Sequence, residues 1–256
     1  MGQRPDNRAA WNGIAAAYQE RDRGPNDRLS WGIWCPDESE LRLLGDVRGK
    51  RCLVLGCGGG EDCVALARMG AAQVIGIDLS GEQLAYARRL AEDEDVAVRL
   101  IQGTVGELSA IESESIDTAI SAHALLYVER IDRCFGETYR VLAPGGLFAF
   151  SFQHPSDTMT DDDPPYAPAK SYFQVQLDWE WNFPEAGVNA TFRSWYRPVS
   201  EWFQALIDAG FTVERILEPP PPQRKPRTSF ERRHSIDKAR LIPQTLIFRA
   251  RKPERP

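Results

Sequence analysis

A glycine-rich turn and an acidic residue at the end of a strand have the spacing of a ligand site. The turn, Gly56-Cys57-Gly58-Gly59-Gly60, lies between a predicted strand over 51–55 and a predicted helix over 61–69. Glycine residues adopt positive φ readily and let a ligand approach the backbone closely. Asp78 ends the next strand 20 residues after Gly58, a spacing at which a carboxylate accepts hydrogen bonds from both hydroxyls of a ribose. The two features together predict a site for a ribose-containing ligand.

The residue that follows the turn argues against a dinucleotide. The dinucleotide fingerprint Gly-x-Gly-x-x-Gly ends in a glycine, and this sequence has Glu61 at that position. Its carboxylate would lie where a pyrophosphate approaches the N-terminus of a helix. A nicotinamide-dependent oxidoreductase is therefore a less favoured interpretation of the turn.

Two histidines follow predicted strands and are the candidate catalytic residues. His123 follows the strand over 116–121, and His154 follows the strand over 147–152. Ligands bind at the carboxyl ends of the strands in open α/β sheets, so either histidine could act as a general base or contact the substrate. Structural roles stay open for both: His123 could shape the pocket at a helix entry, and His154 could be a loop residue before Pro155.

Aromatic residues are concentrated in one segment of the chain. Residues 166–203 carry 11 of the 25 aromatic side chains and follow an acidic triplet at 161–163 that we expect to be solvated. The rings could line a pocket for a planar or apolar acceptor and exclude water, or they could bury the segment against the sheet. The predicted substrate-binding residues are Tyr166, Tyr172, Phe173 and Trp195.

Strands and helices alternate along the part of the chain that must position these residues. Strands are predicted over 51–55, 73–78, 96–102, 116–121, 147–152, 211–219 and 245–251, and helices over 61–69, 84–92, 131–142 and 200–210. This alternation is typical of βαβ units around a mostly parallel sheet. Ser80 followed by Gln83 indicates an N-terminal cap for the helix that comes after Asp78.

Composition and charge narrow the class of protein. The 256 residues are 42% hydrophobic and 27% charged, as in an ordinary globular protein. The sequence shows no signal-peptide pattern and no run of about 18 apolar residues, so we expect a cytoplasmic protein with no membrane partner. The five cysteines form no Cys-x-x-Cys pair, so we expect reduced thiols and no metal site. The formal charge is −6 with a basic excess confined to 215–256, which favours a solvated surface over a nucleic-acid site.

Over about residues 40–153 the sequence resembles the class I S-adenosylmethionine-dependent methyltransferases, in their small-molecule branch. The resemblance rests on LGCGGG at the turn, Asp78, QGTVGEL after the third strand and VLAPGGLFAFSF at the fifth, with WNGIAAAY, DAGF, VERILEP and LIFRARK outside this core. It implies an α/β fold with a doubly wound, seven-stranded, mostly parallel sheet, an aromatic-rich insertion after strand five and a closing β-hairpin. It also implies S-adenosyl-L-methionine as the cofactor.

The resemblance implies which residues contact that cofactor. The glycine turn would pack against its methionine and adenosine parts, Asp78 would bind the ribose, Leu79 would border the adenine, and Tyr18 would lie near the sulfonium. The implied cofactor-binding residues are Tyr18, Leu55, Gly56, Cys57, Gly58, Gly60, Asp78, Leu79, Gln83, Thr104, Val105 and Ser121.

Two positions depart from the family pattern. The family usually has an acid in strand one that helps to hold the methionine amine, and this chain has Val54 there. We expect backbone carbonyls, such as those of Gly56 and Ser121, or the N-terminal lid to hold the amine instead. Thr104 stands where the family often has an Asp that accepts from the adenine amino group, and a hydroxyl accepts more weakly.

The sequence therefore predicts methyl transfer from S-adenosylmethionine to an O, N or C nucleophile of a small, aromatic or apolar metabolite by in-line displacement. A non-catalytic S-adenosylmethionine-binding regulatory or scaffold protein is the alternative. We expect a single domain with a lid at 1–50, a cofactor-binding core at 51–152, an acceptor-site insertion at 153–198 and a closing helix and hairpin at 199–256. The acceptor and the oligomeric state stay open.

Overall fold

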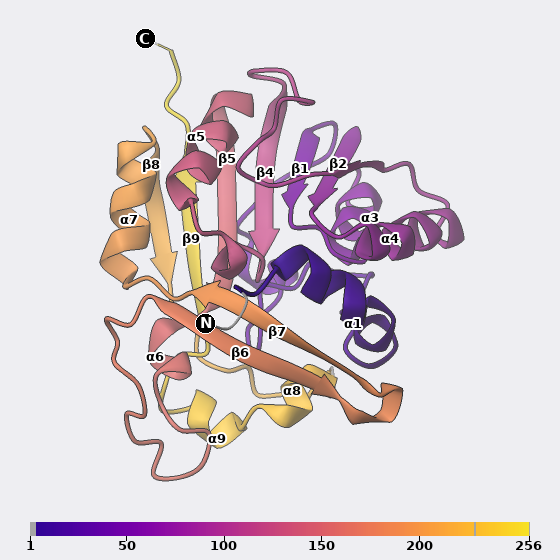
Figure 1. Ribbon diagram of the computed structural model, residues 1–256. Helices are drawn as coiled ribbons and strands as arrows, with labels where there is room; N and C mark the ends of the chain where they lie inside the picture. The colour runs from indigo at the N-terminus through magenta and orange to yellow at the C-terminus, as the bar shows by residue number, and fades with distance from the viewer. Residues whose placement is uncertain (1–3, 228, 256) are drawn as a thin grey trace.

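The computed structural model describes residues 4–227 and 229–255, and a seven-stranded sheet in the order β3-β2-β1-β4-β5-β9-β8 forms its centre (Figure 1). The strands of the sheet are β1 (Arg51–Leu55), β2 (Gln73–Asp78), β3 (Arg99–Gln102), β4 (Ile116–Ala122), β5 (Leu142–Gln153), β8 (Thr212–Leu217) and β9 (Thr245–Arg251). The first five run parallel, and β9 runs antiparallel to both β5 and β8. The predicted seven-stranded, mostly parallel α/β sheet is confirmed.

Helices cover both faces of this sheet. The helices are α1 (Asn7–Arg21), α2 (Glu38–Leu41), α3 (Glu61–Arg68), α4 (Gly81–Asp93), α5 (Ile131–Val141), α6 (Pro155–Thr158), α7 (Val199–Asp208), α8 (Ser229–Arg233) and α9 (Ile236–Ala239), with 3-10 turns η1 (Leu125–Tyr127) and η2 (Pro184–Ala186). Side chains alternate along β1, so Leu53 and Leu55 pack in the core with α5 and α7, and Cys52 and Val54 pack in the core with α3 and α4. Within residues 4–227 and 229–255, no helix combines the length and apolar character needed to cross a membrane.

The local sequence explains where α4 begins and why β3 is short. The Ser80 hydroxyl accepts a hydrogen bond from the Gln83 amide at 3.1 Å, as the capping pattern predicts. At the other end of the helix, the amide of Val96 donates to the carbonyl of Ala91 at 3.0 Å. Because Val96 completes the end of the helix, pairing with β2 starts only at Arg99, and the strand is shorter than the predicted 96–102.

The aromatic-rich insertion after β5 contains an antiparallel hairpin of β6 (Gln176–Phe183) and β7 (Val188–Trp195). In Figure 1 this hairpin and α1 lie across the end of the sheet at which the arrowheads of β1 and β4 point. The side chain of Asn7 joins them, because its amide donates to the Arg193 carbonyl at 2.8 Å and its oxygen accepts from the Arg193 amide at 2.9 Å. The insertion and the N-terminal helix therefore form one layer over the carboxyl edge of the sheet.

The segment between β8 and β9 differs from the prediction. The two strands are antiparallel neighbours, but 27 residues, 218–244, separate them and include α8 and α9, so they are not a simple hairpin. Arginines of this segment bind acids of the N-terminal segment: Arg227 pairs with Asp37 at 2.7 Å, and Arg233 pairs with Asp22 at 2.8 Å. The basic tail is therefore partly engaged within the protein rather than wholly solvated.

Candidate active site

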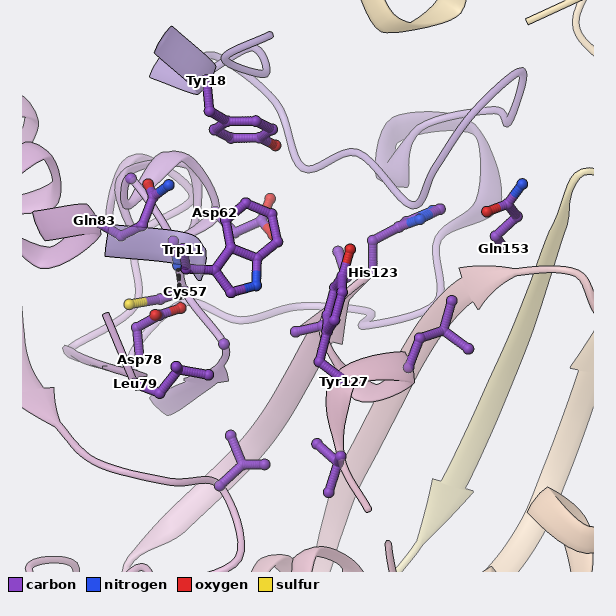
Figure 2. Close-up of a pocket in the computed structure, with 18 of the residues that line it drawn as sticks. Trp11, Tyr18, Cys57, Asp62, Asp78, Leu79, Gln83, His123, Tyr127 and Gln153 are labelled. Atoms are coloured by element: carbon purple, nitrogen blue, oxygen red, sulfur yellow. Dashed lines mark hydrogen bonds between the residues drawn. The ribbon is translucent and has the colours of Figure 1, made fainter. Parts of the chain in front are cut away.

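A cavity of about 610 Å³ lies at the carboxyl edge of the sheet, between the strand ends and the layer formed by α1 and the hairpin. It is lined by the glycine turn, the segments that follow β2, β3 and β4, α1 with the residues after it, and β6. In the view of Figure 2, Asp78 and Leu79 lie on one side of the indole of Trp11, and His123 and Tyr127 lie on the other. The cavity thus joins two chemically different regions.

The glycine turn forms the floor of the first region and is held against β2. The amide of Gly56 donates to the Ile77 carbonyl at 2.8 Å, and the amide of Cys57 donates to the same oxygen at 3.0 Å. Gly56 has φ +70°, and an added Cβ there would lie 2.2 Å from the Cβ of Ala124. Only glycine fits this conformation and this spacing, so the turn keeps its backbone open toward the cavity.

Asp78 is a buried carboxylate that two backbone amides hold in one orientation. One oxygen accepts from Gly58 at 2.9 Å, and the other accepts from Ser80 at 2.8 Å. Burial raises the pKa of Asp78, while these hydrogen bonds lower it. Because each carboxylate oxygen has a second lone pair, Asp78 can still accept from two ligand hydroxyls.

Gln83 adds a donor beside this acceptor. Its side-chain oxygen accepts from the amide of Gln19 in α1 at 2.7 Å, and its exposed fraction is 2%. The Nε2 atom of Gln83 is buried, belongs to a cavity-lining residue and has no hydrogen-bond partner among the described residues. An acceptor pair at Asp78 with a donor at Gln83 fits ribose hydroxyls, which both donate and accept, so the chain's polar groups suit the adenosine part of S-adenosylmethionine.

Aromatic rings form the wall of the second region. Trp11 makes edge contacts with Tyr18, Tyr127 and Trp181 at centroid distances of 5.5, 5.4 and 6.1 Å. Trp179 lies 5.6 Å from Trp181, and both line the cavity. Such edge and tilted packing is favourable for aromatic rings and presents an apolar surface. This wall suits the apolar body of a small molecule.

His123 lies at the cavity in a buried setting. Its φ is +57°, and burial lowers its pKa to about 4, although the Trp31 backbone raises it in part. The buried Nε2 atom has no partner among the described residues and faces Gly32, where an added Cβ would lie 2.4 Å away. His123 is therefore neutral near pH 7, and its Nε2 atom is directed at the Gly32 segment.

His154 does not line the cavity, which corrects its predicted place in the site. It is 4% exposed and caps α6, because Nδ1 accepts from the Ser156 amide at 3.0 Å. Its Nε2 lies 2.9 Å from Glu218 Oε1. Both ring nitrogens therefore have partners within the protein, which assigns His154 a structural role.

The structure brings most of the predicted cofactor residues together. Those that line the cavity are Tyr18, Gly56, Cys57, Gly58, Asp78, Leu79, Gln83, Thr104 and Val105. Leu55, Gly60 and Ser121 lie outside the lining: the Ser121 hydroxyl donates to the Leu55 carbonyl at 2.8 Å, and Gly60 caps α3. Leu55 and Ser121 therefore hold the chain just before the glycine turn, and Gly60 joins the turn to α3.

The predicted substrate-binding residues do not line the cavity. Phe173 is 78% exposed, and Trp195 is buried outside the lining. The Tyr172 hydroxyl accepts from the Val199 amide at 3.1 Å, and the Tyr166 hydroxyl lies 3.3 Å from Ser235 Oγ. Other aromatic rings of the chain line the cavity instead.

The residues that sequence reasoning missed are Trp11, Tyr127, Trp179, Trp181 and Tyr196, all of which line the cavity. The spacing of aromatic residues in the sequence indicates some of them. Trp11 and Tyr18 are seven residues apart and so share one face of α1, and Trp179 and Trp181 alternate with charged residues along β6.

The cysteines form no disulfide bonds. The five cysteines are free and buried. In the part of the chain that the structure describes, no group of His, Cys, Asp or Glu side chains is arranged to hold a metal ion.

The strand order, the glycine turn after β1 and the buried acid that ends β2 are those of the class I S-adenosylmethionine-dependent methyltransferases. A family model described as a methyltransferase domain matches residues 53–150. The chain therefore has the fold of this class and a methyltransferase domain over residues 53–150, which supports the predicted class and S-adenosyl-L-methionine as the cofactor.

Similar proteins agree with this class. An S-adenosylmethionine-dependent methyltransferase from Mesorhizobium loti is 28% identical, with a TM-score of 0.66 over 83% of this chain and 95% of that one. A candidate methyltransferase of the same kind from Listeria monocytogenes is 27% identical, with a TM-score of 0.66 over 85% of this chain and 98% of that one. An uncharacterized methyltransferase of Bacillus subtilis is 32% identical over 43% of this chain, and the chain spans 42% of that relative's length.

Proposed function

We propose that this chain transfers the methyl group of S-adenosyl-L-methionine to an O, N or C nucleophile of a small molecule with an aromatic or apolar body. One observation carries the proposal: a single cavity of about 610 Å³ joins the glycine turn and Asp78 to a wall of aromatic rings. A cavity of this size suits small ligands rather than a polymer. The arrangement supports a cofactor and an acceptor that meet in one cavity.

On the cofactor side, the residues bind and orient. Asp78 and Gln83 would hold the ribose hydroxyls, and the backbone of Gly56 and Gly58 would lie against the rest of the molecule. Leu79 and Val105, which also line the cavity, would border the adenine. When bound, S-adenosylmethionine supplies an electrophilic methyl group on a sulfonium, so the protein's main task is to fix the approach of the nucleophile.

On the acceptor side, the rings of Trp11, Trp179 and Trp181 would hold the acceptor body and exclude water from the methyl group. Tyr18 and Tyr127, whose hydroxyl pKa values are raised by burial, stay protonated near neutral pH. His123 is the remaining sequence-predicted candidate for proton transfer, and its low pKa makes it a weak base. The arrangement best suits an acceptor whose nucleophile reacts without a strong protein base.

The proposal keeps a small-molecule acceptor and no nucleic-acid partner. Arginines of the basic tail support this, because Arg224 pairs with Glu231 at 2.7 Å and Arg227 pairs with Asp37 at 2.7 Å. Nucleic-acid surfaces need several cations directed at phosphates. We also keep the single-domain division proposed from the sequence, with the lid at 1–50 and the acceptor side at 153–198.

The test is transfer of an isotope-labelled methyl group from S-adenosylmethionine to a panel of phenols, amines, enolisable ketones and aromatic carboxylates, read by mass spectrometry. We expect label on a subset that shares an aromatic or apolar body, and loss of transfer in Asp78→Ala. Tight binding of S-adenosylhomocysteine without transfer to any acceptor would instead favour the non-catalytic binding protein. The cavity beneath the hairpin supports catalysis over that alternative, because a scaffold could fill the same space with side chains.

A further inference from the structure

A hydrophobic residue occupies the strand-one position at which an acid would help to hold the cofactor's amine. Val54 is 1% exposed and packs in the core with α3 and α4. The methionine part of the cofactor carries an ammonium group, and burying a cation without a counter-charge is costly. The cavity must therefore supply negative charge from another element, or backbone carbonyls alone must hold this group.

Two carboxylates at the start of α3 meet this requirement. Glu61 and Asp62 come directly after the glycine turn, and both line the cavity. The Oε1 atom of Glu61 is buried and has no hydrogen-bond partner among the described residues. The Ser30 backbone lowers the pKa of Asp62, and the carboxylate keeps lone pairs for a further donor. The site thus holds a buried acceptor that lacks a donor.

The surroundings of the pair leave this charge uncompensated. Asp22, which also lines the cavity and acts with the pair on Tyr18, is paired with Arg233 at 2.8 Å and with Arg21 at 3.1 Å. Glu61 and Asp62 form no ion pair in the described parts of the chain, and Arg23, which is exposed, acts on Glu61 only at a distance. Burial raises the pKa of both carboxyl groups to about 7.

We infer that Glu61 and Asp62 hold the α-ammonium group of the cofactor's methionine part, in place of the acid that strand one lacks. The pair follows directly on the glycine turn, against which the cofactor would lie, and belongs to α3 rather than to the aromatic wall of Trp11, Trp179 and Trp181. The inference rests on the proposed use of S-adenosylmethionine. It also explains why Glu61 occupies the sixth position of the turn, where a dinucleotide site needs glycine.

The test compares two ligands in calorimetry with the full-length protein. S-adenosylhomocysteine carries the amine, and 5′-S-(3-carboxypropyl)-5′-thioadenosine is the same molecule without it. We expect the wild type to bind the aminated ligand about 10- to 100-fold more tightly at pH 8, as for a charge-assisted hydrogen bond. The double variant Glu61→Gln/Asp62→Asn should bind both ligands with similar affinity.

Lowering the pH gives a second arm that needs no variant. Protonation of the pair between pH 8 and pH 6 should weaken the aminated ligand and leave the other unchanged. The other ionisable groups near the pair are Tyr18 of α1, Asp22 at the C-terminal cap of α1, Arg23, and Cys57 of the turn, and Arg233 of α8 is bound to Asp22. The matched control is Asp93→Asn at the far, exposed end of α4, which removes one charge away from the cavity and should behave as the wild type.

The outcomes separate the inference from the proposed function. Equal binding of both ligands by the wild type, or unchanged preference in the double variant, overturns the inference while leaving the cofactor in place. Unchanged preference with lost methyl transfer assigns the pair to the acceptor side instead and also overturns it. Binding of neither ligand by the wild type overturns both the inference and the proposed function.

Discussion

The two sides of the cavity are built in opposite ways. The cofactor side consists of strand ends and turns, where Gly56, Gly58 and Asp78 are fixed by backbone hydrogen bonds to β2 and to each other. The acceptor side consists of rings carried by α1, η1 and β6, which are far apart in sequence and contact one another only through packing. The first side is determined locally and the second by tertiary structure.

Because of this difference, the two sides of the cavity should tolerate different substitutions. Backbone geometry on the cofactor side leaves little freedom, because the turn must keep positive φ and close contacts at the same time. Rings on the acceptor side can change size or shape and still cover the methyl group. Under the proposed function, the fixed side would set the chemistry and the packed side would select the acceptor.

The largest expected effect comes from Gly56→Ala compared with Gly58→Ala. At Gly56 the added Cβ would lie 2.2 Å from Ala124, whereas at Gly58 nothing lies within 4 Å, although both have positive φ. We expect losses in the free energy of unfolding of about 2–4 kcal/mol for Gly56→Ala and about 1 kcal/mol for Gly58→Ala. Thermal and urea unfolding measure this difference. Equal losses would mean that strain alone, and not the contact with Ala124, keeps glycine at this position.

Glu61 and Asp62, on the cofactor side of the cavity, should make the free energy of unfolding depend on pH. Their folded-state pKa values of about 7 exceed the ordinary values of 4.5 and 3.8, so their contribution to stability is complete below about pH 4 and is lost as the pH rises through 7. Glu61→Gln/Asp62→Asn should therefore raise the free energy of unfolding at pH 8 by about 3 kcal/mol and flatten its dependence between about pH 5 and 8.

His123 changes the free energy of unfolding with pH in the opposite direction, and it does so equally in the wild type and in the double variant. Its pKa is depressed to about 4, so its contribution is present above the ordinary 6.5 and is lost as the pH falls through 4. This contribution cancels when variant and wild type are compared at each pH. Urea unfolding of ligand-free protein at several pH values is the measurement, and a variant less stable than the wild type at pH 8 would contradict the account.

A ring exchanged on the acceptor side should change turnover more than cofactor affinity. Trp181→Ala removes part of the wall, and we expect about tenfold lower kcat/KM for the acceptor with less than about twofold change in S-adenosylhomocysteine affinity. Phe173→Ala is the matched control, since Phe173 is 78% exposed. If Phe173→Ala had the larger effect on turnover, the acceptor would bind where the sequence placed it.

The smallest expected effect on catalysis comes from His154→Ala. The substitution removes the cap of α6 and the contact with Glu218, so unfolding should become easier by about 1–2 kcal/mol. Turnover at a temperature well below the melting transition should stay within about twofold of the wild type. A large loss of kcat in protein shown to be folded by circular dichroism would return His154 to the mechanism.

Much of the fold could be predicted from the sequence because its signals are local. The strand over 51–55, the glycine turn and the Ser80 cap follow from hydrophobic runs, backbone needs and helix capping within a few residues. The same holds for Asp78, whose position at the end of β2 fixes its place beside the turn. Neighbouring residues in the sequence are enough to explain each of these features.

The acceptor wall could not be predicted in the same way. The sequence shows that residues 166–203 are rich in aromatic rings, but which rings face the cavity depends on how the β6–β7 hairpin packs on α1. The place of His154 does not follow from the sequence, because a histidine after a strand can cap a short helix as well as face a ligand. The pairing of Arg233 with Asp22 joins parts of the chain that no sequence pattern connects.

The measurement that tests the central claim most directly is calorimetric titration of S-adenosylhomocysteine into the wild type and Asp78→Ala, with NADH as a parallel ligand. The account predicts binding of S-adenosylhomocysteine and not of NADH. It also predicts that Asp78→Ala binds more weakly by about 1–3 kcal/mol, because buried ribose hydroxyls lose a charged acceptor. Equal binding by the wild type and Asp78→Ala, or binding of NADH alone, would contradict it.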